Sequence, residues 1–158
     1  MAAVVLAASF ICGVSADGPS RKLLGEASHE WDYAGIFELE ANKDYFMTLE
    51  KNAEGKYSED EQQLLILPVD ISISTNAGLE QASKTATKVW GKDKQEVAPG
   101  SQVPLGVWTH MEPDQDIWVT LFKIRTTEDG PHAFFAKHDP KEFENHFHYL
   151  RDADGNDV

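Results

Sequence analysis

The sequence predicts a mainly β protein, an antiparallel β-sandwich of six to seven strands with a short C-terminal helix and one helix candidate in mid-chain. Short apolar stretches recur along the chain, turn-forming residues separate them, and few stretches have the periodicity of a helix. The chain has 158 residues, of which 41% are apolar and 10% aromatic, and this composition fits a folded domain rather than a disordered chain. We therefore expect a single domain over residues 29–151, followed by an acidic tail or linker over residues 152–158.

The first two strands are expected on either side of a short turn. Residues 31–40 carry loosely alternating apolar side chains, residues 41–44 form the turn, and residues 45–49 (YFMTL) supply the second strand. Two such runs joined by a turn are typical of a β-hairpin. A polar loop rich in acidic residues follows. Residues 62–73 then contain the apolar run LLILPVDISI, which predicts a buried strand that its proline interrupts at a bulge or sheet edge.

Residues 78–90 are the mid-chain helix candidate. Leu79, Ala82 and Ala86 would fall roughly on one helical face, and Gly91 would end the helix. The same stretch could instead be a long loop. Further strands are predicted at residues 102–110, 116–126 and 132–137, and their tryptophans are expected in the core.

The C-terminal helix is predicted over residues 140–150. Asp139 is suited to the N-cap position, a proline occupies the first helical position, and Glu142 stands three residues after the cap. Such a helix would bury its phenylalanines on one side. It would place Glu142 and His146 along a neighbouring side.

The N-terminal 16 residues, MAAVVLAASFICGVSA, are uncharged and end in small residues that suit signal peptidase. We interpret residues 1–16 as a signal peptide and residues 17–28 as a flexible lead-in, with a buried N-terminal strand or helix as the alternative. Cys12 is the only cysteine of the chain and would leave with the signal. The mature chain would then have no disulfide and no thiolate metal site, and it would be secreted or extracytoplasmic, in a periplasm or at a cell surface.

The net charge excludes one broad class of partner. The chain has 27 acidic and 14 basic residues and a formal charge of −13, whereas nucleic acid binding needs a basic face. A metal ion, a basic protein partner or a membrane transporter remains compatible with this charge. The apolar run at the N-terminus is short for crossing a bilayer. No transmembrane segment is predicted in the mature chain either.

Four of the six histidines fall within residues 132–148, in HAFFAKHDPKEFENHFH. Imidazole and carboxylate groups together suit zinc and copper(II), and a helix would bring residues four apart onto one side. Whether the first histidine joins the others depends on the turn at Asp139. The candidate metal ligands, of which three or four would be used, are His132, His138, Glu142, His146 and His148. His29 and His110 are possible further ligands, and Met111 would favour copper if it took part.

Each of these residues also has a simpler explanation. Glu142 is accounted for as the capping partner of Asp139, and the histidines could be ordinary surface residues. The end of the chain, DADGND, resembles the opening of an EF-hand calcium loop through Asp152, Asp154 and Asn156. The glycine required at the sixth position of that loop is absent, so we expect an acidic turn there rather than a calcium site.

Two stretches resemble small exported domains that handle metals outside the cytoplasm in marine microbes and algae. These domains open with W-x-x-A-G-x-F and close with H-x-P-x-E-F and H-Y-L. The matching residues are Trp31, Ala34, Gly35 and Phe37, then His138, Pro140, Glu142, Phe143, His148, Tyr149 and Leu150. The resemblance implies metal handling, with His138 and His148 as the motif's histidines and His146 peripheral.

The function expected from the sequence is therefore capture or delivery of a divalent transition metal by the C-terminal histidines and glutamate. The alternative is a non-enzymatic structural or binding module of a cell surface or extrinsic complex, which exposed tryptophans would support. We do not expect an enzyme, because no hydrolase, P-loop or dinucleotide-binding motif occurs and no general base is placed for hydrolysis.

Overall fold

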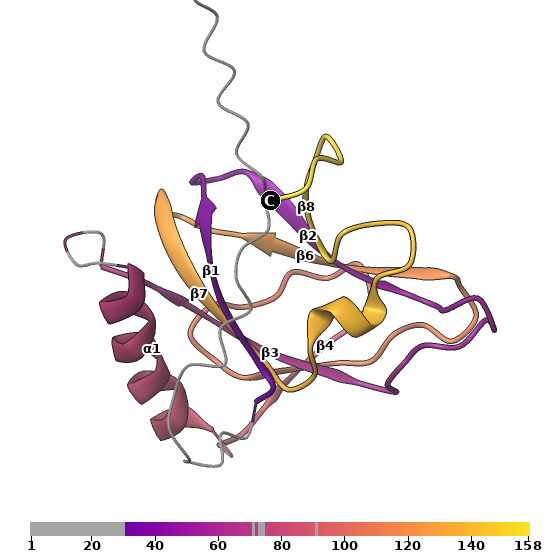
Figure 1. Ribbon diagram of the computed structural model, residues 1–158, viewed down its shortest axis with the longest axis horizontal. Helices are drawn as coiled ribbons and strands as arrows, with labels where there is room; N and C mark the ends of the chain where they lie inside the picture. The colour runs from indigo at the N-terminus through magenta and orange to yellow at the C-terminus, as the bar shows by residue number, and fades with distance from the viewer. Residues whose placement is uncertain (1–30, 71, 73–74, 91) are drawn as a thin grey trace, which may run out of the picture.

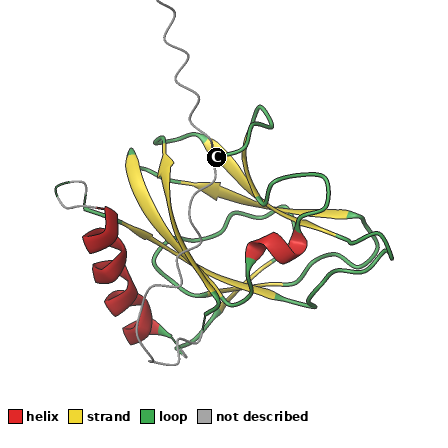
Figure 2. Cartoon of the chain, viewed as in Figure 1, coloured by secondary structure: helices red, strands yellow, loops and turns green. Residues whose placement is uncertain are grey.

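The computed structural model describes residues 31–70, 72, 75–90 and 92–158. The expected signal peptide (1–16), the expected lead-in (17–28), His29 and Gly91 lie outside the described residues. The described chain forms eight strands, one α-helix and one 3-10 turn, and this confirms the mainly β prediction (Figures 1 and 2). In chain order these are β1 (Tyr33–Leu39), β2 (Asp44–Glu50), β3 (Gln62–Pro68), α1 (Thr75–Val89), β4 (Gln95–Val97), β5 (Thr109–Met111), β6 (Val119–Arg125), β7 (Gly130–Ala136), η1 (Pro140–Phe143) and β8 (Leu150–Asp152).

The strands form two sheets that pack face to face. The five-stranded sheet has the order β1-β7-β3-β5-β4 and the three-stranded sheet has the order β6-β2-β8. All neighbours are antiparallel except β4 and β5, which run parallel. Alternate side chains of both sheets point into a shared core, which includes Leu64, Ile66 and Phe134 of the larger sheet and Met47 and Phe122 of the smaller one.

A second apolar cluster covers the other face of the five-stranded sheet. Helix α1 lies on this face (Figure 1) and contributes Ala82 and Ala86, whose small side chains permit close approach to the strands. The sheet contributes Leu65 and Phe135 to the same cluster. The larger sheet is therefore buried on both faces, which explains why β3 reads as a continuous apolar run.

The prediction that the first two strands form a β-hairpin is wrong. The turn forms as predicted, with Asn42 at a φ of 61°, but it carries the chain from one sheet to the other. Strand β1 pairs with β7, whereas β2 pairs with β6 and β8. Strand β1 has apolar side chains on both faces, including Ile36 toward the helix and Phe37 toward the sandwich core, and this suits the sheet that is covered on both sides.

The mid-chain helix is confirmed as α1, which begins three residues before the expected start. The C-terminal helix is much shorter than predicted. Asp139 caps η1 through a hydrogen bond from the Lys141 amide, but Glu144 is already extended. The next backbone amides, those of residues 145–147, donate to the carboxylate of Glu50 instead of forming helical hydrogen bonds. Tertiary contacts thus override the local helical pattern.

The residues expected as an acidic tail fold back on the domain. Asp152 belongs to β8, and its side chain accepts hydrogen bonds from the amides of Asp154 and Asn156. Arg151 forms a bridge with Asp157, and Val158 packs against the sandwich core. The side chain of Asn156 also lowers the pKa of Asp152, by a hydrogen bond to its carboxylate. The sequence that resembles a calcium loop is therefore a closed turn.

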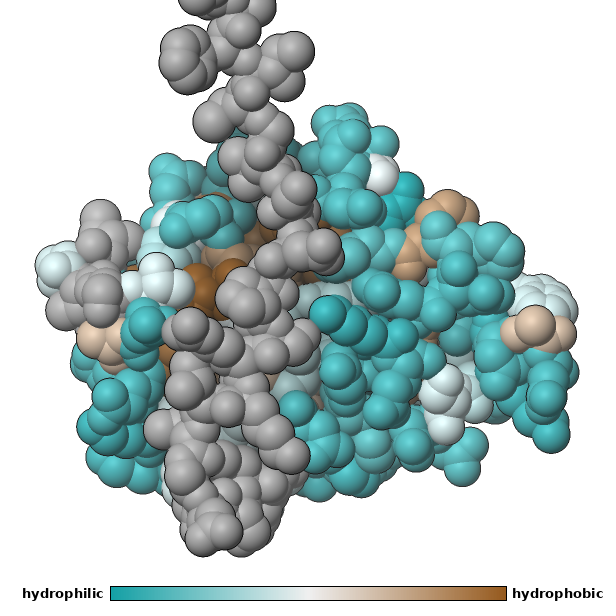
Figure 3. Space-filling view, in the orientation of Figure 1, coloured by the Kyte–Doolittle hydropathy of each residue, from teal (hydrophilic) through white to brown (hydrophobic). Residues whose placement is uncertain are grey.

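Hydrophilic residues cover most of the visible surface of the described chain in Figure 3. Among the described residues, no helix is both long and apolar enough to cross a membrane.

Candidate metal centre

The fold brings together one histidine and two glutamates from three segments of the chain. Glu59 lies in the loop between β2 and β3, His138 follows β7, and Glu142 belongs to η1. One ligand atom from each residue lies within 4.8 Å of the other two, and His138 Nδ1 stands 4.0 Å from Glu59 Oε1. His138 is half-buried, whereas both glutamates are exposed.

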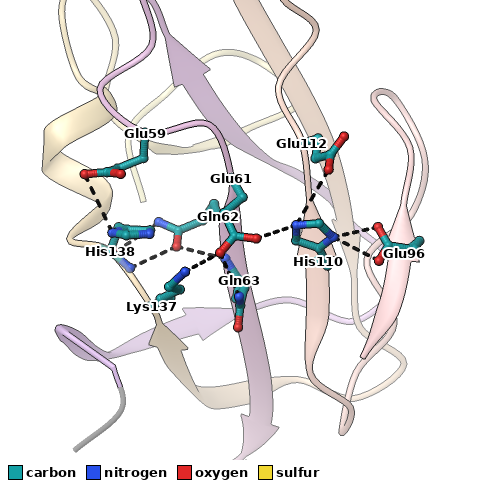
Figure 4. Close-up of polar contacts among 9 residues, drawn as sticks. All are labelled: Glu59, Glu61, Gln62, Gln63, Glu96, His110, Glu112, Lys137 and His138. Carbon is teal, nitrogen blue, oxygen red and sulfur yellow. Dashed lines mark hydrogen bonds and ion pairs between the residues drawn. The ribbon is translucent and has the colours of Figure 1, made fainter. Parts of the chain in front are cut away.

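The backbone of His138 is held at both of its polar groups by one side chain. Gln62 is fully buried, and its Oε1 accepts a hydrogen bond from the His138 amide at 3.1 Å. Its Nε2 donates to the His138 carbonyl oxygen at 2.9 Å. Figure 4 shows this pairing between the start of β3 and the end of β7. A buried side chain with both ends bonded fixes the position of the histidine relative to the sheet.

The two glutamates are brought together by a separate contact. Ser58, the neighbour of Glu59, donates its hydroxyl to the carbonyl oxygen of Glu142 at 2.5 Å. The Glu142 amide donates in turn to the carbonyl oxygen of Asp139 at 2.9 Å, within η1. The loop that carries Glu59 is thereby fastened to the turn that carries Glu142.

The arrangement has the donor set of an open metal site and a spacing slightly wider than that of a bound one. Zinc takes imidazole nitrogen and carboxylate oxygen at about 2.0–2.2 Å in tetrahedral geometry, so two ligand atoms on one ion lie roughly 3.4 Å apart. His138 Nδ1 and Glu59 Oε1 stand 4.0 Å apart, and movement of the exposed glutamate side chains would close this gap. One imidazole with two carboxylates suits zinc and also other first-row divalent ions. Three protein ligands would leave a position for water or a further ligand.

The structure brings His138 and Glu142 together, but it places the other predicted ligands elsewhere. His132 is buried, and its Nδ1 contacts the carbonyl oxygen of Gly130 at 2.9 Å. His146 is exposed, with Nδ1 3.8 Å from Glu50. His148 stacks on Tyr149 at a centroid distance of 4.3 Å. Because η1 ends at Phe143, the spacing of four residues never becomes a shared helical side.

Sequence reasoning missed Glu59. It lies in a polar loop among several acidic residues, and nothing in its spacing distinguishes it from the others. Only the pairing of β3 with β7 brings the start of one strand beside the end of the other, and this pairing cannot be read from local pattern.

His110, the other described histidine, belongs to a different group of side chains. Its Nε2 lies 2.5 Å from Glu61 Oε2, and its Nδ1 lies 2.7 Å from Glu96 Oε2 (Figure 4). Met111, the possible copper ligand, is fully buried in the sandwich core. Neither residue lies in the Glu59, His138 and Glu142 group.

The tryptophans divide between the core and the surface. Trp31 and Trp108 are buried and, with Trp90, form a packed cluster on the helix-bearing face. Trp118 is 59% exposed, so the prediction that it lies in the core is wrong. It stands beside exposed Ile117, at the entrance to β6.

No protein-family model, curated protein or solved structure matches this chain.

Proposed function

We propose that the protein binds a divalent transition metal, of the zinc or copper class, through Glu59, His138 and Glu142, for capture or delivery outside the cytoplasm. The observation that carries the proposal is the convergence of these three ligand atoms within 4.8 Å from three separate segments. The proposal keeps two of the ligands predicted from the sequence and adds Glu59. It leaves His132, His146 and His148 out of the site.

The buried clamp on His138 supports binding rather than accidental proximity. Gln62 fixes the backbone of His138, so only the side-chain torsions of this ligand remain to be ordered when an ion binds, and a larger part of the ligand–metal interaction appears as affinity. The exposed glutamates give the ion access from solvent.

Calorimetric titration of the full chain with zinc, and separately with copper(II), tests the proposal. We expect one saturable ion per chain for at least one of the metals. His138→Ala, Glu59→Gln and Glu142→Gln should each weaken binding by at least about tenfold, since even residues outside the ligand set cost that much in metal sites. The matched control is His146→Ala, because this histidine is exposed and outside the group.

Two results would contradict the metal site. One is the absence of saturable binding by the wild-type chain with either metal. The other is wild-type affinity in all three ligand variants. Equal losses of metal affinity in His146→Ala and His138→Ala would place the site at the C-terminal histidines that the sequence predicted.

A structural or binding module is the second candidate, and it has an observation of its own. Trp118, Ile117 and Leu121 are 59%, 43% and 41% exposed and lie close together along the chain at β6. Exposed aromatic and aliphatic side chains in one place are typical of contact surfaces. If both metals fail to bind, Trp118→Ser in a binding assay with candidate partners becomes the next experiment.

A further inference from the structure

His110 lies in a row of polar side chains across the five-stranded sheet. In the strand register, His110 of β5 stands opposite Gln63 of β3 and opposite Glu96 of β4. Residues paired in this way project from the same face of a sheet. The face is the one that carries α1, and the row lies beyond the apolar cluster under the helix.

Both ring nitrogens of His110 face carboxylates from different elements. Nδ1 lies 2.9 Å from Glu96 Oε1 and 2.7 Å from Glu96 Oε2. Nε2 lies 2.5 Å from Oε2 of Glu61, which immediately precedes β3. Figure 4 shows the imidazole between these two glutamates.

Only the protonated ring can satisfy both contacts. A neutral imidazole has one N–H, so its other nitrogen would direct a lone pair at a carboxylate oxygen. The imidazolium has two N–H groups and can donate to both carboxylates. A metal does not fit between His110 and Glu61, because a separation of 2.5 Å is too short for two ligands of one ion with bonds of about 2.0–2.2 Å.

Further charged groups surround the histidine. Glu112, which follows β5, places Oε1 3.9 Å from Nε2 of His110. Lys137, which directly follows β7, donates to Oε1 of Glu61, whereas His110 contacts Oε2 of the same carboxylate. This lysine holds the pKa of Glu61 at about 2, against the opposing effect of its partial burial, so Glu61 is a carboxylate at any ordinary pH. Among the described residues, the charged groups that face His110 are thus three carboxylates, and the cation nearest to this group is Lys137, which bonds to Glu61.

We propose that protonated His110 is a pH-dependent clip that fastens β4 to the start of β3. Strand β4 has three residues and stands at the edge of its sheet, where β5 is its strand partner. Glu96 is the side chain of β4 that the clip holds. Deprotonation removes one of the two donors of His110, so either the Glu96 or the Glu61 contact is lost and the edge strand is held less firmly.

Hydrogen exchange of the full chain, followed by NMR between pH 5 and pH 9, tests the clip. The reporter is the Gln95 amide, which donates to the carbonyl oxygen of Trp108 at 2.9 Å. Its protection factor, corrected for the intrinsic effect of pH, should fall roughly tenfold as His110 loses its proton. The internal reference is the Thr48 amide of the other sheet, which donates to Tyr149 and should keep its protection.

Two variants isolate the cause. His110→Gln is neutral throughout the range and should abolish the pH response of the Gln95 amide. Glu96→Gln, at a side chain that is 74% exposed, removes one carboxylate partner and should reduce the response to below about threefold. His146→Gln is the matched histidine control and should respond as the wild type does.

The proposal is overturned if the Gln95 and Thr48 amides keep the same relative protection at every pH. It is also overturned if Glu96→Gln responds as strongly as the wild type. A pH response that disappears only in His146→Gln would assign the effect to that histidine. None of these results bears on metal binding, because the clip and the metal site share no residue.

Discussion

The His138 group and the His110 group have the same chemical components and opposite geometries. In the first, imidazole and carboxylate stand 4.0 Å apart, which leaves space for an ion between them. In the second, both ring nitrogens lie within 2.9 Å of carboxylate oxygens, so protons fill the space instead. Residue type alone therefore does not distinguish a metal site from a salt bridge, whereas the separation of the ligand atoms does.

One short segment supplies residues to both groups. Glu59 reaches toward His138, Glu61 reaches toward His110, and Gln62 fixes the backbone of His138 (Figure 4). The two groups can therefore be perturbed separately by substitutions a few residues apart.

The largest effect is expected from Gln62→Leu. The apolar side chain keeps a similar volume but leaves the amide and carbonyl of His138 without their partner, which should lower the free energy of unfolding by about 2–3 kcal/mol. Urea unfolding measures the change, and Gln81→Leu on the exposed side of α1 is the control. A loss below about 0.5 kcal/mol would show that the clamp does not hold His138.

An intermediate effect is expected from Glu61→Gln, and it depends on pH. The folded pKa of Glu61, about 2, lies below its ordinary value of 4.5, chiefly because of the hydrogen bond from Lys137. The carboxylate therefore contributes stability above about pH 4.5 and loses it as pH falls toward 2. At neutral pH the variant should lose about 1–2 kcal/mol, allowing for solvent screening of a partly exposed group.

Urea midpoints measured for both chains between pH 7 and pH 3 check this prediction. The difference between wild type and Glu61→Gln should shrink as the solution becomes more acidic. A difference that stays constant across the range would mean that the Glu61 charge contributes nothing.

The smallest effect is expected from Glu112→Gln. This glutamate is 3.9 Å from Nε2 of His110, and its side chain is 72% exposed. The change in unfolding free energy should stay within about 0.5 kcal/mol, as for other exposed charge pairs. Urea unfolding measures it, and zinc titration of the same variant should match the wild type. A larger loss of stability would make Glu112 a third support of the clip.

The fold class could be predicted because it depends on features that the sequence carries locally. Most apolar runs of strand length, the turn at residues 41–44 and the helix α1 formed as expected. The strand predicted at residues 102–110 is an exception, because only Thr109–Met111 forms a strand there and the residues before it are a loop. Strand pairing could not be predicted, since the turn before β2 is compatible with a hairpin and with a passage between sheets. The choice depends on burial of β1 on both faces, and that follows from α1, which lies later in the chain.

The candidate site was predictable only where its residues are neighbours in sequence. His138 and Glu142 could be proposed as neighbours from the cap at Asp139. The structure confirms this cap and brings both residues into one group. His146 and His148 were included through a helix that ends early, because Glu50 takes the amides that would have continued it. Burial raises the pKa of Glu50, but these amide hydrogen bonds outweigh that effect and the pKa is lowered. Neither Glu50 nor Glu59 carries any signal of its role in the sequence.

The passage of the chain between the sheets at Asn42 has a consequence for the order of assembly. Strand β1 is paired with β7, and β2 is paired with β6 and β8. Both early strands therefore need partners from the last third of the chain before they can pair. Of the strand pairs described, only those among β3, β4 and β5 lie within residues 62–111. Such distant pairings are slow to form. A nascent chain would therefore keep β1 and β2 without their strand partners until residues 119–152 have been synthesised.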